Sequence, residues 1–129
     1  MTTSWVDRAT GRVFTTLALS GPRGTCEGKF LVDTGCPVTS CDPDMIDLAG
    51  YSVRDARRLS RLIGPGDGRI VGYQIPIIGF VALGKESGPF EIHVHDMPRE
   101  DGIDGLLGMD FLLRHVFIVD GPAGTVELR

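Results

Sequence analysis

The chain has 129 residues, 42% hydrophobic and 23% charged, a composition typical of one soluble globular domain spanning 1–129. Its 18 glycines and 8 prolines favour short strands joined by tight turns over long helices. The net charge of −4, without a long basic block, argues against nucleic acid as a partner, and the longest nearly apolar run, 75–83, is too short to cross a bilayer.

The cysteines and the N-terminal residues bear on the cellular compartment of the protein. The three cysteines, an odd number at irregular spacing, form neither a disulfide framework nor a zinc pattern. The N-terminal residues do not follow the basic, apolar and small-residue order of a secretory signal. We therefore expect a reduced, cytoplasmic protein.

The first elements are strands. After a short edge strand at 4–6, the β-prone residues 12–20 and 26–32 flank the turn residues 21–24, which predicts a β-hairpin. The second arm of this hairpin ends at Asp33, so the strand delivers a carboxylate to its own end.

A short helix and a charged segment follow. Asp42 is a good N-cap before Pro43, and Gly50 ends a helix predicted over 44–49. The arginine-rich run 54–61 is either a patch for an anionic substrate or a solvated strand or turn surface, and we favour the solvated surface.

A second hairpin is predicted around the glycine-rich segment 64–68. The β-prone residues 62–63 and 69–75 form its arms, and so many glycines let the tip move and lay backbone against a ligand. An ordinary exposed hairpin is the alternative. Further strands are predicted at 76–83 and 90–94.

His93 and His95 alternate with Val94 and so point to the same face of a strand. A metal site needs a third ligand that no recognisable spacing offers, so we expect surface or partner-facing histidines and no metal.

Two motifs carry the chemistry. Residues 30–36 read Phe-Leu-Val-Asp-Thr-Gly-Cys, which places Asp33 at the end of an apolar strand, where a charge needs pairing. Gly108 lies 75 residues after Asp33 and ends a Leu-Leu-Gly motif at 106–108. The segment 109–115 follows this motif, and strands are predicted at 117–120 and 125–128.

These elements, in this order over 12–128, resemble retropepsin-like aspartic proteases, including small bacterial domains and the protease-like domain of ubiquitin-shuttle proteins. The resemblance implies an all-β acid-protease fold: a closed β-barrel-like sandwich with a flap hairpin, one or two short helices and no cofactor. It implies a catalytic group of Asp33, Thr34 and Gly35. It also implies substrate-binding residues on the flap and beside the catalytic loop: Ile63, Gly64, Pro65, Gly66, Asp67, Gly68, Leu106, Leu107 and Gly108.

The chain departs from the family pattern at Cys36-Pro37, where Ala or Ser and a freer residue are usual, and at the flap tip, which has no obvious aromatic residue. A nucleophilic Cys36 is disfavoured because the neighbouring Asp33 raises the pKa of a thiol.

The chain contains one Asp-Thr-Gly, so two carboxylates that share a proton have to come from a homodimer, Asp33 facing Asp33. Residues 2–6 and 125–128 are candidates for the dimer sheet. By resemblance, Thr34 locks the two loops by crossed hydrogen bonds, and the flaps close over an extended peptide or protein substrate. The alternative is a non-catalytic module of the same fold that dimerises or binds peptides.

Overall fold

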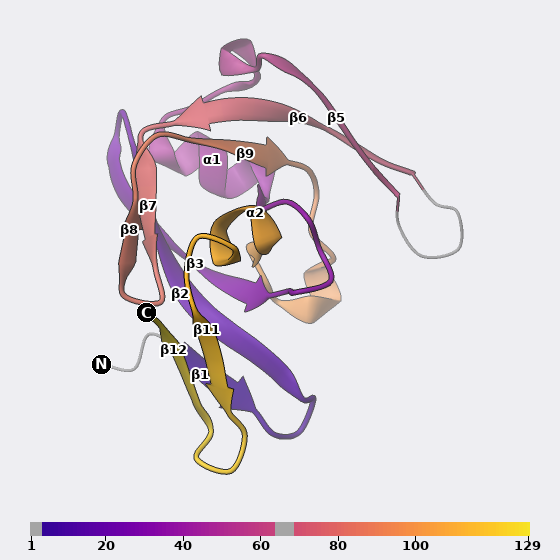
Figure 1. Ribbon diagram of the computed structural model, residues 1–129. Helices are drawn as coiled ribbons and strands as arrows, with labels where there is room; N and C mark the ends of the chain where they lie inside the picture. The colour runs from indigo at the N-terminus through magenta and orange to yellow at the C-terminus, as the bar shows by residue number, and fades with distance from the viewer. Residues whose placement is uncertain (1–3, 64–68) are drawn as a thin grey trace.

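The computed structural model describes residues 4–63 and 69–129. These residues form mostly β structure with two short helices (Figure 1). The strands are β1 (Ser4–Asp7), β2 (Arg12–Gly21), β3 (Gly24–Val32), β4 (Ser40–Cys41), β5 (Arg58–Ile63), β6 (Arg69–Ile77), β7 (Gly79–Ala82), β8 (Lys85–Ser87), β9 (Phe90–Val94), β10 (Gly105–Leu107), β11 (Phe117–Asp120) and β12 (Thr125–Leu128). The helices are α1 (Pro43–Ala49) and α2 (Met109–Leu112), with 3-10 turns η1 (Val53–Asp55) and η3 (Arg99–Asp101).

The sequence predicted the first hairpin and the first helix. β2 and β3 pair antiparallel and close on Gly21 and Gly24. Asp42 caps α1 by accepting a hydrogen bond from the Asp44 N–H, and Gly50 ends the helix with φ of 97°. Both elements follow from local side-chain chemistry, so both predictions are confirmed.

The strand predicted at 76–83 was placed wrongly. β6 continues through Pro76, which lies opposite Glu91 on β9, and the chain bends at Ile78. Gly79 then begins β7 with φ of 158°, and a Cβ there would lie 2.4 Å from the carbonyl oxygen of Ser87. The bend therefore requires glycine at 79, whereas Pro76 is accommodated within β6 and does not cause the bend.

The main sheet runs in the order β5-β6-β9-β4-β10-β3-β2-β7-β8, with β1 paired to β2. Among the described strands this order is open, with β5 and β8 at its ends, and β11 and β12 form a separate two-stranded sheet. The expected closed barrel is therefore not formed. In Figure 1, β5 and the outer part of β6 extend away from the body, so β5 does not reach β8.

The core lies between the inner faces of the strands and the two helices. Alternate residues of β9 and of the inner parts of β2 and β3 are buried, as a half-buried sheet requires. Fully buried side chains include Leu17, Leu19, Phe30, Ile75, Ile92, Leu107 and Phe111. Within the ranges 4–63 and 69–129, no helix is long and apolar enough to span a membrane.

Candidate active site

Asp33 follows the last residue of β3 and is fixed by the strand beside it. Val32 pairs with Leu107 of β10 in parallel register, and the Asp33 N–H donates to the Leu107 carbonyl at 2.9 Å. The Gly35 N–H donates to Asp33 Oδ1 at 2.9 Å, which fixes the carboxylate against its own loop. Asp33 is half-buried in the single chain, so its carboxylate remains open to a second group.

The position of β10 defines the site. β3 and β4 are successive strands, but β10 lies between them, parallel to β3 and antiparallel to β4. Leu106 and Leu107 therefore run alongside the strand that carries Asp33, with Leu107 buried and Leu106 half-buried. Gly105 is equally constrained, because a Cβ there would lie 2.3 Å from both the Phe30 ring and the Ser40 carbonyl.

The loop after Asp33 packs directly on the segment that follows β10. The Met109 N–H donates to the Cys36 carbonyl at 2.8 Å, and the Asp110 N–H to the Pro37 carbonyl at 3.1 Å. A Cβ on Gly108 would lie 2.3 Å from the Val38 carbonyl oxygen. Glycine at 108 thus permits the close approach of two backbones, a contact between distant segments that no local pattern in the sequence indicates.

Thr39 and Asp110 are supporting residues that sequence reasoning missed. The Asp110 carboxylate accepts hydrogen bonds from the Thr39 N–H at 3.0 Å and the Thr39 hydroxyl at 2.7 Å. The Gly108 N–H donates to Thr39 Oγ1 at 3.1 Å. Neither residue stands out in the amino-acid sequence, because their hydrogen bonds join segments that are 71 residues apart.

Thr34 and Gly35 lie in the exposed part of the same loop. Within the described chain, the Thr34 hydroxyl makes no hydrogen bond. It is therefore available to a group outside the chain, as the predicted crossed contact requires.

The second hairpin is formed by β5 and β6, whose antiparallel register runs from Arg58↔Gln74 to Ile63↔Arg69. Its backbone at Ile63 is described, whereas the predicted substrate-binding residues Gly64, Pro65, Gly66, Asp67 and Gly68 lie outside the described residues. In Figure 1 the arrowhead of β3 points toward the side of the view on which the outer ends of β5 and β6 lie.

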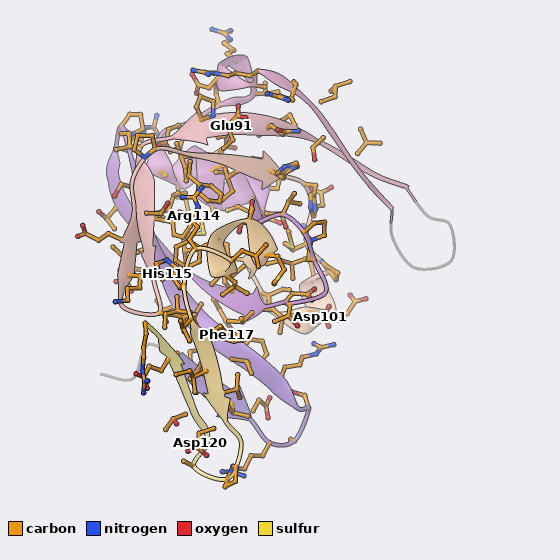
Figure 2. All side chains as sticks on the ribbon, in the orientation of Figure 1. Glu91, Asp101, Arg114, His115, Phe117 and Asp120 are labelled. Atoms are coloured by element: carbon orange, nitrogen blue, oxygen red, sulfur yellow. The ribbon has the colours of Figure 1, made fainter. Side chains whose placement is uncertain are left out.

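Two concavities share Arg12 and Leu31, and the smaller one reaches the loop at Asp33 and Thr34. One, of about 370 Å³, is lined by Gly11, Arg12, Val13, Leu31, Val32, Asp33, Thr34, Phe117 and Val119. The other, of about 430 Å³, is mostly apolar and is lined by Arg12, Leu31, His95, Asp96, Met97, Pro98, Asp101, Ile103 and Leu106. Arg12, which lines both concavities, forms an ion pair at 3.4 Å with Asp101, which lines the larger one; Figure 2 labels Asp101 and Phe117.

The two histidines are not both surface residues. His95 is 6% exposed, and His93 is half-buried, with its Nδ1 hydrogen-bonded to Ser60 Oγ. Burial lowers the pKa of His93. In the part of the chain that the structure describes, no group of three or more His, Cys, Asp or Glu could hold a metal ion.

Cys36 lies in the loop but is poorly suited to nucleophilic attack. Burial raises the pKa of its thiol; the hydrogen bond to the Val38 carbonyl opposes this, and the charges of Asp33 and Asp110 add to it. The predicted direction is confirmed, although burial outweighs the charge of Asp33.

Comparisons with known proteins bear on the family and the fold. A family model described as aspartyl protease matches residues 18–111. A retropepsin-like aspartic protease from Rickettsia conorii has a similar structure, with a TM-score of 0.64 and 21% identity over 91% of this chain and 83% of that chain. The retroviral protease-like domain of Ddi1 from Leishmania major gives a TM-score of 0.57 and 19% identity over 89% of this chain and 86% of that one. At these identities the likeness shows the fold, and no curated protein matches.

Proposed function

Because the chain belongs to the aspartyl protease family, we propose that it is an aspartic endopeptidase that acts as a homodimer through two copies of Asp33. The observation that carries this proposal is the carboxylate of Asp33. It is anchored by Leu107 and Gly35 and yet half-exposed at the end of a buried strand.

Hydrolysis of a peptide bond needs an activated water and a proton for the leaving amine. Two carboxylates within hydrogen-bond distance cannot both be ionised, so the pair holds one proton. The ionised member takes a proton from water, and the protonated member hydrogen-bonds the scissile carbonyl; these roles belong to the pair. One chain supplies one such carboxylate, so the second comes from a second copy.

The concavity of about 370 Å³ beside Asp33 supports an interface with that copy. Its wall combines the open Thr34 with apolar side chains of the separate β11–β12 sheet, Phe117 and Val119, the second of which is 45% exposed. Burying such apolar surface favours association. A partner loop seated there would place its own Asp33 and Thr34 against those of the first chain.

The substrate is an extended peptide. Leu106 lines the apolar concavity of about 430 Å³, which suits an apolar substrate side chain. Leu107 and Gly108 hold the wall of the site, and the hairpin of β5 and β6 covers the bound peptide. The substrate-binding residues proposed on this hairpin are Ile63 and 64–68.

The test is cleavage of a diverse peptide library from acid to neutral pH by the wild type, Asp33→Asn and Asp47→Asn. Asp47 is exposed on α1, so its substitution makes the same chemical change away from the site. The proposal expects cleavage by the wild type and Asp47→Asn and none by a folded, dimeric Asp33→Asn. No cleavage by a folded wild-type dimer at any pH would contradict it and favour a non-catalytic peptide-binding module.

A further inference from the structure

Ser60 on β5 and His93 on β9 are joined by a hydrogen bond between Ser60 Oγ and His93 Nδ1. These strands are not neighbours, because β6 lies between them in the sheet (Figure 1). Ser60 is 1% exposed and His93 half-buried. The contact therefore connects β5, the outer arm of the hairpin, to the body of the sheet. Because the two side chains are largely shielded from water, the hydrogen bond is stronger than it would be in solvent.

Gly72 makes this connection possible. It pairs with Ser60 across β5 and β6, and a Cβ on it would lie 1.9 Å from the Val94 carbonyl oxygen and 2.9 Å from the His95 Cβ. No side chain fits at 72, so none stands between Ser60 and β9.

The backbone of His93 meets the catalytic loop directly. Its N–H donates to the Thr39 carbonyl at 3.1 Å, and Thr39 is the residue whose N–H and hydroxyl are held by Asp110. His93 thus touches the hairpin with its ring and the end of the Asp33 loop with its backbone.

We propose that His93 is a positioning residue that fixes the β5–β6 hairpin relative to the catalytic loop through the contacts Ser60–His93 and His93–Thr39. The consequence for peptide binding rests on the proposed function, since it requires the hairpin to cover a peptide. The connection itself does not depend on catalysis and can be measured without it.

The variants distinguish the effect of losing the Ser60–His93 hydrogen bond from the effect of losing the imidazole ring. Ser60→Ala and His93→Phe each remove the bond, and His93→Asn keeps an oxygen near the position of Nδ1 that can accept from Ser60. Ser87→Ala is the matched control, because Ser87 is also a buried serine, and its hydroxyl donates to the adjacent Gly88 carbonyl instead of a distant strand. Because Ser60→Ala and His93→Phe remove the same hydrogen bond, the proposal can still be tested with one of them if the other does not fold.

Hydrogen–deuterium exchange of the full chain is the first measurement. Ser60→Ala and His93→Phe should each speed exchange at the amides of His93 and Thr39 by about fivefold, the order expected for one lost hydrogen bond. The double variant should add nothing further, and His93→Asn and Ser87→Ala should match the wild type. Faster exchange confined to β5 and β6, or additive effects in the double variant, would overturn the proposal.

Kinetics on the best-cleaved library peptide then test the role in binding. Ser60→Ala should raise KM by about fivefold and leave kcat within about twofold. A fall in kcat with an unchanged KM would contradict a role in holding the peptide. If the wild type cleaves nothing, the proposed function fails while the exchange measurement still decides whether the hairpin and the loop are connected.

Discussion

Thr39 and Asp110 are 71 residues apart in the sequence and are joined by two hydrogen bonds, of 3.0 and 2.7 Å, to the same carboxylate. Asp33, at the other end of the loop, is tied to β10 through the Leu107 carbonyl. Both ends of the catalytic loop are therefore fixed to the one segment formed by β10 and α2, while residues 34 and 35, next to the carboxylate, are exposed.

Removing the Asp110 carboxylate should destabilise the protein. Asp110→Ala leaves the N–H and hydroxyl of the fully buried Thr39 without their partner, which should cost about 2 to 3 kcal/mol of unfolding free energy. Asp110→Asn keeps one acceptor and should cost about half as much. Urea unfolding measures both, with Asp47→Ala as an exposed control; equal stability of Asp110→Ala and wild type would contradict the assigned role.

A methyl group at position 108 should separate the two backbones that meet there. In Gly108→Ala the Cβ would lie 2.3 Å from the Val38 carbonyl oxygen, and neither backbone can move without breaking loop contacts. We expect a loss of about 2 kcal/mol or more and reduced cleavage. Gly121→Ala, where a Cβ meets nothing within 4 Å, is the control. If both variants unfold at the same urea concentration, the close approach at 108 is not needed.

The elements that sequence could predict are those with local causes. The hairpin of β2 and β3, the helix capped by Asp42 and ended by Gly50, and the carboxylate after β3 all follow from neighbouring residues. The Asp-Thr-Gly and Leu-Leu-Gly motifs identified the family because they occur together, in order and far apart.

The remaining features depend on contacts between distant segments. The pairing of Asp110 with Thr39 and the burial of His95 are set by which strands become neighbours, and no residue pattern along the chain records that. The bend at Ile78 was missed for a related reason: residues 76–83 were predicted as one strand, whereas the close approach of Gly79 to Ser87 produces a break within that range. The open strand order likewise appears only when the whole sheet is assembled.

Cys36 should be dispensable for the chemistry. Since burial raises the pKa of its thiol, iodoacetamide should alkylate Cys36 with a pH midpoint above that of a free cysteine, about 8.5. Cys36→Ala should retain cleavage within about threefold, because the hydrogen bond that its Sγ makes within the described residues goes to the Val38 carbonyl and not to Asp33. Mass spectrometry of the Cys36 peptide follows the alkylation. Loss of all cleavage in a folded Cys36→Ala would show that the thiol takes part.

The stability of the protein should fall on mild acidification because of His93. Burial lowers the pKa of His93 below 6.5; Asp110 and Glu91 oppose this shift, while His95 and Arg58 add to it. Below pH 6.5 the unfolded chain therefore takes up a proton more readily than the folded one, and stability decreases as the pH falls through that window. More than about one pH unit above 6.5, the ring is neutral in both states and contributes no pH dependence.

To isolate this effect, the urea midpoint of unfolding is measured for the wild type and for His93→Asn at a series of pH values between pH 8 and pH 5. The asparagine variant cannot titrate at this position, so its stability should fall less steeply below pH 6.5. Parallel curves for the two proteins would contradict the assignment to His93.

The central claim, one active site built from the Asp33 residues of two chains, is tested most directly by mixing wild type with Asp33→Asn at constant total concentration. After the protomers have exchanged, only wild-type homodimers carry both carboxylates, so an equal mixture should keep about one quarter of the wild-type cleavage rate. A rate of about one half, proportional to the wild-type fraction, would mean that each chain works alone and would contradict the account.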